Sequence, residues 1–128
     1  PPAALRTMID DVTRAGGVVV LRGLPNNSAK ALTAALSKVA RPGEQLTSVG
    51  IDPRLFRAFG VAAVPTYVVT GSDFDLCDGF DCVTAVPPHD RMTGNVSAAY
   101  ALETFARGDG PGALIAAQHL ARLERPKP

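Results

Sequence analysis

The sequence predicts an α/β fold in which a central mixed sheet carries helices on both faces. Segments with helical spacing alternate with short apolar runs, in the order α-β-α-β-α-β-hairpin-α-α, which favours this class over bundles or sandwiches. The run Val18–Leu21 is continuously apolar, as expected of a central strand covered on both faces. A chain of 128 residues is long enough to bury a core of this kind.

The first half of the chain supplies two helices and two strands. A helix over 3–15 is indicated by apolar residues at helical spacing, and Gly16-Gly17 ends it. After the strand at 18–21 comes a turn in which Asn26 or Asn27 can cap the next helix. That helix presents one apolar face, formed by Ala29, Leu32, Leu36 and Val39. A weaker strand pattern follows over 45–51.

The middle of the chain, residues 52–70, has the clearest local pattern. Asp52 can cap a short helix over 53–59 with its carboxylate, and Pro53 suits the first helical position. Gly60 supplies the positive φ that ends this helix. Val64-Pro65 then stands directly before a β-branched and aromatic strand at Thr66–Thr70.

The last third begins with an irregular section, Gly71 to Gly94, for which a hairpin around Asp78-Gly79 is the simplest interpretation. Ser97 then caps a helix that presents Val96, Tyr100, Ala101 and Phe105. Pro111 opens a final helix whose apolar positions are Leu114, Ala117, Leu120 and Ala121. We expect the aromatic residues of the chain to pack in the core, in particular Phe56, Phe59, Tyr67 and Phe105.

The pattern of a short helix, Gly60-Val61, Val64-Pro65-Thr66 and a strand resembles the thioredoxin superfamily. The resemblance implies a cis Val64–Pro65 bond and a thioredoxin-like domain over 16–124, with an N-terminal helix at 1–15 and a tail at 125–128. A thioredoxin-type enzyme needs a cysteine at the start of the helix after the first core strand. Residues 22–28 contain none, and Ser28 there is expected to be a helix-start residue. Dithiol exchange at the usual position is therefore excluded.

Two cysteines, Cys77 and Cys82, lie among Asp73, Asp75, Asp78 and Asp81. A small structural disulfide is our expectation, with a redox-active pair or free thiols as alternatives. The aspartates disfavour thiolates by like-charge repulsion, which argues against a reactive nucleophile. The aspartates themselves are expected to form a solvated loop, since their spacing lacks the pattern of a calcium-binding loop.

Other classes of function find little support in the sequence. His89 and His119 have no ligand-spaced partners, so both are expected to pack structurally and no metal or other cofactor is expected. The net charge of +1 gives no case for nucleic acid, and no apolar run approaches the roughly 20 residues of a membrane helix. Because the chain opens on Pro-Pro without methionine, we expect a processed or trimmed product.

Further motifs in the right order resemble the F-type conjugative-transfer pilin assembly family called TrbC. They are Val18–Leu24, Phe59-Gly60-Val61 with Val64-Pro65-Thr66, Gly94-Asn95-Val96-Ser97, and Tyr100-Ala101-Leu102-Glu103. This resemblance covers about residues 16–108. It implies a periplasmic, non-enzymatic protein that assists assembly of the conjugative pilus in a type IV secretion system. The implied partner is TraW, with other pilus-assembly proteins beside it, and the family supplies no catalytic residues.

These observations lead to two main functional hypotheses; a third, a chaperone that binds apolar segments of pilin, differs from the first only in its partner. In the first, the former active-site face is a docking surface formed by Gly23, Leu24, Pro25, Asn26, Val64, Pro65 and Thr66, where an extended partner segment is held by β-type hydrogen bonds. In the second, Cys77 and Cys82 form a displaced site for thiol-disulfide exchange. The first is favoured because the aspartates oppose the second.

Overall fold

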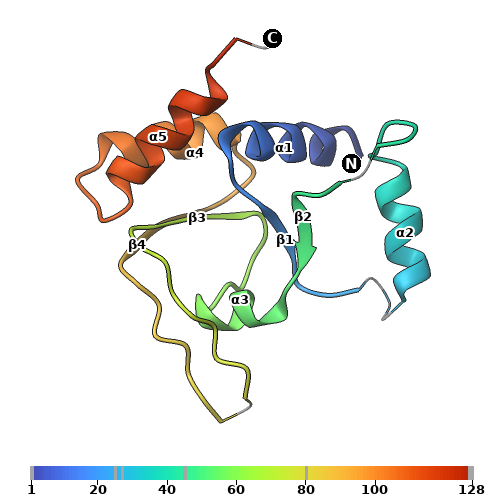
Figure 1. The fold of residues 1–128 in the computed structure, drawn as a ribbon, viewed down its shortest axis with the longest axis horizontal. Coiled ribbons are helices and arrows are strands. Elements are labelled where there is room, and N and C mark those ends of the chain that lie inside the picture. The colour runs from blue at the N-terminus through green and yellow to red at the C-terminus, as the bar shows by residue number, and fades with distance from the viewer. Residues whose placement is uncertain (1, 25, 27, 45, 80, 127–128) are drawn as a thin grey trace.

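The structure, a computed structural model, describes residues 2–24, 26, 28–44, 46–79 and 81–126. The described residues form an α/β protein with five helices and four strands (Figure 1). In chain order these are α1 (Pro2–Ala15), β1 (Val19–Leu21), α2 (Ala29–Ser37), β2 (Val49–Ile51), α3 (Pro53–Ala58), β3 (Thr66–Thr70), β4 (His89–Thr93), α4 (Ala98–Arg107) and α5 (Ala113–Leu123). The α/β class expected from the sequence is confirmed. No helix in the described ranges is both long and apolar enough to span a membrane.

The strands form two separate two-stranded sheets within the described residues, where one continuous mixed sheet was expected. β1 and β2 pair in parallel, with Val19 opposite Val49, whereas β3 and β4 pair antiparallel, with Thr66 opposite Thr93. β1 is therefore paired along one edge only, and neighbouring Val18 keeps 68% of its surface exposed. The apolar run predicted as a fully covered central strand is instead partly open to solvent. A continuously apolar sequence therefore does not show that a strand is paired along both edges.

The core lies where α1, α4 and α5 meet the β3–β4 sheet. Its buried cluster consists of Ala15, Ala101, Leu102, Phe105, Ala116 and Leu123, and Tyr67, Val69 and Met92 of the sheet pack against it. Ala101 and Ala116 are completely buried, and such small side chains let α4 and α5 approach closely. Figure 1 shows these two helices side by side, with α1 next to them. Phe105 and Tyr67 are thus core residues as expected.

Three helices begin at side chains that accept backbone hydrogen bonds. Asp52 Oδ1 accepts from the Arg54 amide at 3.0 Å, and Ser97 Oγ accepts from the Tyr100 amide at 3.0 Å. Both caps confirm the sequence prediction. The cap of α2 is Ser28, whose Oγ accepts from the Ala31 amide at 3.1 Å, rather than Asn26 or Asn27. Asn26 instead takes a positive φ of 51° in the preceding turn, and Asn27 lies outside the described residues.

Strand β4 was missed by the sequence prediction, which treated the whole of 71–94 as irregular. Its sequence, His-Asp-Arg-Met-Thr, lacks the apolar alternation from which strands are recognised. Its charged side chains are used for internal bonds instead. Asp90 Oδ2 accepts from the Gly112 amide at 2.8 Å, and the Arg91 guanidinium donates to the Phe59 carbonyl.

The apolar faces of the last two helices are also partly different from those expected. On α5, Ala116 and Leu123 are buried while Leu114 is 82% exposed and Ala117 and Ala121 face solvent. On α4, Tyr100 is 55% exposed. Both helices contain more apolar residues than one face can hold, so the choice of face depends on the tertiary contacts.

Candidate functional site

The predicted docking surface consists of two segments, one after β1 and one before β3. In the first, Leu24 has 39% of its surface exposed, Gly23 and Asn26 are also exposed, and Pro25 lies outside the described residues. In the second, Val64 has 72% of its surface exposed. Exposed apolar side chains mark an interaction site when they lie together in one patch. Each of the two segments exposes one large apolar side chain, Leu24 in the first and Val64 in the second.

The turn at Pro65 is held by several hydrogen bonds. The Val64–Pro65 peptide bond is cis, which is the geometry that the thioredoxin resemblance implied. The Pro65 carbonyl accepts from the Gly94 amide at 3.0 Å, and Thr66 Oγ1 donates to the Ala63 carbonyl at 2.7 Å. Thr66 Oγ1 also lies 2.8 Å from Thr93 Oγ1 on β4. The Thr66 hydroxyl therefore serves the turn itself, and Val64 is the more available side chain.

Arg22 links the end of β1 to the loop that leads to Val64. Its guanidinium donates to the Val61 carbonyl at 2.6 Å and lies 5.1 Å from the centre of the Phe56 ring. Among the described residues, no hydrogen bond joins Gly23, Leu24 or Asn26 directly to Val64, Pro65 or Thr66. Arg22 is thus the connection between the two sides of the surface. Sequence reasoning missed it, because a single arginine after a strand carries no pattern.

The start of α2 is the place where a thioredoxin-type enzyme would carry its nucleophile. In this chain Ser28 is the residue there, and its hydroxyl accepts the Ala31 amide hydrogen bond as the helix cap. No acid or base contacts this hydroxyl among the described residues. A serine used as a cap, without a neighbouring base, is not activated for nucleophilic attack.

The two cysteines form a disulfide, as expected, with their Cα atoms 6.1 Å apart. The Cys77 amide donates to Thr84 Oγ1 at 2.9 Å, and the Gly79 amide contacts Cys82 Sγ at 3.2 Å. The loop is tied to α3 by an ion pair between Asp78 and Arg54. These bonds describe a closed loop that is braced against the domain.

The two histidines make structural contacts. His89 Nδ1 lies 2.9 Å from the Pro87 carbonyl oxygen, and the ring packs edge-on against Phe59 with centroids 4.8 Å apart. His119 Nδ1 lies 2.6 Å from the Ala15 carbonyl oxygen, where it joins α5 to the end of α1. Within the described part of the chain, no three histidine, cysteine, aspartate or glutamate side chains are grouped so that they can hold a metal ion.

Comparison with known proteins places the chain in a family. A family model described as "Type-F conjugative transfer system pilin assembly protein" matches residues 1–105. A curated relative, the "Periplasmic protein TrbC" of Escherichia coli (strain K12), is 30% identical over 106 residues. The match covers 83% of this chain and 43% of the relative, so the chain spans less than half of that protein. No solved structure matches. The chain belongs to the family of type-F conjugative transfer system pilin assembly proteins, which confirms the resemblance seen in its motifs.

Proposed function

We propose that this protein is a periplasmic pilus-assembly protein that acts by docking a partner on a thioredoxin-like scaffold, without catalysis. The single observation that carries the proposal is that both segments expose a large apolar side chain, Leu24 after β1 and Val64 directly before Pro65, and that Arg22 ties the first segment to the loop of the second. Family membership supports the role in pilin assembly. The name of the E. coli relative supports the periplasm, and a disulfide suits that oxidising compartment.

The thioredoxin-like scaffold is supported by local geometry. A helix follows β1, a parallel strand follows that helix, and the cis-proline stands directly before the antiparallel pair β3–β4. We propose the same domain limits as the sequence analysis, 16–124, with the helix over 1–15 packed against it. A fold does not determine an activity, so the function must be argued from the surface itself.

The proposed partner is a TraW-like periplasmic assembly protein that presents an extended segment to this surface. The residues just before Pro65, 62–64, are exposed and could pair with a strand-like segment, in which main-chain hydrogen bonds give affinity and pockets for alternate side chains give specificity. Leu24 and Val64 would then contact apolar side chains of that segment. Docking of other pilus-assembly proteins on the same surface is compatible with this mode.

The test is binding of purified TraW to the variant Leu24→Asp/Val64→Asp. Both side chains are exposed, so the fold is expected to survive, which circular dichroism would verify. Burying two carboxylates in an apolar contact should weaken binding by about tenfold or more. Leu114→Asp is the matched control, because Leu114 is 82% exposed on α5, away from both segments. Equal binding by the wild type and both variants would remove this surface from consideration.

The alternative, a displaced thiol-disulfide site at Cys77 and Cys82, has a simple biochemical test. Because Asp78 and Asp81 lie between the two cysteines, one next to each, and disfavour thiolates, we expect no reduction of insulin by the protein with a thiol reductant at low concentration. Turnover above the buffer rate that disappears in Cys77→Ser/Cys82→Ser would replace our proposal with the redox function.

A further inference from the structure

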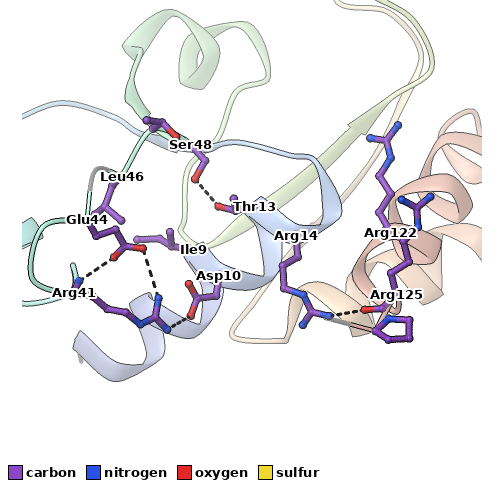
Figure 2. A pocket seen from close by; sticks show the side chains of 12 residues that line it. Ile9, Asp10, Thr13, Arg14, Arg41, Glu44, Leu46, Ser48, Arg122 and Arg125 are labelled. Atoms are coloured by element: carbon purple, nitrogen blue, oxygen red, sulfur yellow. Dashed lines mark hydrogen bonds and ion pairs between the residues drawn. The ribbon is translucent and has the colours of Figure 1, made fainter. Parts of the chain in front are cut away.

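A cleft of about 670 Å³ lies between α1, the segment before β2 and the end of α5 (Figure 2). None of its lining residues belongs to the docking surface of Leu24 and Val64. It is lined by Ile9, Asp10, Thr13, Arg14, Arg41, Glu44, Leu46, Thr47, Ser48, Arg122, Arg125 and Pro126. A hydrogen bond between the hydroxyls of Thr13 and Ser48 joins two of its walls, so the cleft is held in shape by internal contacts.

Both carboxylates of the cleft are already neutralised by arginines. Asp10 is paired with Arg6 at 2.8 Å and with Arg41 at 3.3 Å. Glu44 is paired with Arg41 at 3.5 Å and accepts from Arg6 Nη2 at 2.9 Å. The hydrogen bond to Glu44 raises the pKa of Arg6 above its ordinary value, so Arg6 keeps its charge in this group of paired side chains.

Three further arginines are left without a carboxylate among the described residues. Arg14 Nη2 donates to the Leu123 carbonyl at 2.8 Å and to the Arg125 carbonyl at 3.1 Å, which holds it at the end of α5. The side chains of Arg122 and Arg125 make neither an ion pair nor a hydrogen bond within the described part of the chain. Figure 2 shows Arg122 and Arg125 on the side of the cleft away from Asp10 and Glu44, with Arg14 between the two sides. A concave wall of unpaired positive charge raises the local concentration of anions.

Interaction with helix dipoles explains only part of this arrangement. Arg14 and Arg122 stand in the last turns of α1 and α5, where a cation is favourable. Arg125 lies beyond the end of α5 and gains little from that dipole, which falls off within the last turn. The spare donors of Arg122 and Arg125 therefore point to a ligand outside the helices.

We infer that this cleft binds an extended acidic peptide segment of a protein partner. The argument is charge complementarity: guanidinium groups present planar donor pairs that match carboxylates. Arg122 and Arg125 are three residues apart, so their positions on α5 and its continuation are separated by roughly 5–6 Å. Alternate residues of an extended peptide are roughly 7 Å apart. Two acidic residues with one residue between them therefore fit the two arginines.

Other anions fit the cleft less well. Nucleic acid usually adds aromatic stacking to a basic groove, and none of the described residues that line this one is aromatic. Binding to a membrane surface needs an exposed apolar face beside the basic groups, whereas in this cleft Ile9 is buried and Leu46 is half-buried. The inference is independent of the proposed partner at Leu24 and Val64, because the two surfaces share no residue.

The experiment uses the full chain and a fluorescent peptide, Gly-Glu-Ala-Glu-Ala-Glu-Gly, with its glutamine analogue as the control ligand. Fluorescence anisotropy should show saturable binding of the acidic peptide only, weakening as NaCl rises from about 50 to 300 mM. In the variant Arg122→Gln/Arg125→Gln the dissociation constant should rise about tenfold. The matched control Lys30→Gln/Arg107→Gln removes the same charge from exposed positions outside the cleft and should change it less than about twofold.

Three results would overturn the inference. They are equal weakening in both double variants, no saturable binding up to roughly 1 mM peptide, or binding to phosphatidylglycerol vesicles that needs Arg122 and Arg125 while the peptide fails to bind. The single variant Arg125→Gln, together with a thermal melt of each protein, separates loss of binding from loss of folding. TraW binding by the cleft variant tells the two surfaces apart, since only failure at Leu24 and Val64 bears on the proposed function.

Discussion

The two halves of this domain use helices of similar length in different ways. In the second half, α4 buries four side chains, and three of them, Ala101, Leu102 and Phe105, belong to the core cluster. In the first half, α2 buries none of its residues, although its sequence is as apolar as that of α4. Apolar composition therefore does not show which helix is part of the core. The elements of the second half are closely packed, whereas in the first half α2, Leu24 and Val64 remain accessible to solvent.

In the first half, α1 contributes Ala15 to the core, whereas the connection between α2 and β2 is held by polar contacts. Arg6 of α1 donates to the Val39 carbonyl at 3.1 Å and pairs with Glu44, which fixes the connection between α2 and β2. Arg22 fixes the end of β1 in the same manner. Val39 is the residue of this connection that is buried. Elements with few buried apolar contacts unfold locally more readily. Both proposed docking surfaces include such elements of the first half, the segment at Leu24 and the segment 41–48.

The sharpest test of this comparison is a pair of truncations, Phe105→Ala on α4 and Leu36→Ala on α2. Loss of the buried Phe105 ring leaves a cavity and should lower the free energy of unfolding by about 3–5 kcal/mol. Leu36 is only partly buried, so its loss should cost about 1 kcal/mol. Urea unfolding followed by circular dichroism measures both. Similar losses at the two sites would mean that α2 is packed as tightly as α4.

Replacing a glycine by alanine in each half tests the same difference in packing, because the substitution adds a methyl group. A Cβ at Gly112 would lie 2.8 Å from the Val69 carbonyl oxygen, so Gly112→Ala should destabilise the protein by about 1–3 kcal/mol. No described heavy atom lies within 4 Å of the same position at Gly50 in β2. Gly50→Ala should therefore be neutral or stabilising by up to about 1 kcal/mol. Thermal denaturation compares them, and a marked loss at Gly50 would contradict an open first half.

Local signals made most of the elements predictable from the sequence. Asp52, Ser97 and Gly60 act within a few residues of their own position, so helix starts and stops could be predicted from them. Strand β4 could not be predicted, because its polar residues are explained only by distant partners such as Gly112. The separation of the sheets and the exposed position of Leu114 likewise depend on how the elements pack.

The candidate sites, like the secondary-structure elements, were predictable from the sequence only where their residues lie close together in the chain. Cys77 and Cys82 are close in sequence, so their disulfide was predictable. The arginine cleft was not, because it combines residues from α1, the segment 41–48 and the end of α5, which are brought together only by the fold. Its arginines carry no spacing signal in the sequence, and the nearly neutral net charge conceals the local excess.

The smallest expected effect concerns Asp52, which caps α3 directly after β2 and pairs with Arg54. Arg54 in turn pairs with Asp78 in the second half of the chain. The Arg54 guanidinium, 2.9 Å from the Asp52 carboxylate, holds the pKa of the Asp52 carboxyl below its ordinary value, and the backbone hydrogen bond of the cap acts in the same direction. A lowered folded-state pKa means that the ionised group stabilises the protein at all pH values above the unfolded pKa of about 3.9. This contribution is lost as the pH falls below about 4 and through the folded pKa.

Asp52→Asn keeps a capping oxygen but removes the charge, so the stability difference between wild type and variant should shrink between pH 7 and pH 3. Urea unfolding across that range measures it. A difference that stays constant would show that Asp52 contributes through its cap alone, and that the charge pair with Arg54 adds nothing to the junction between the halves.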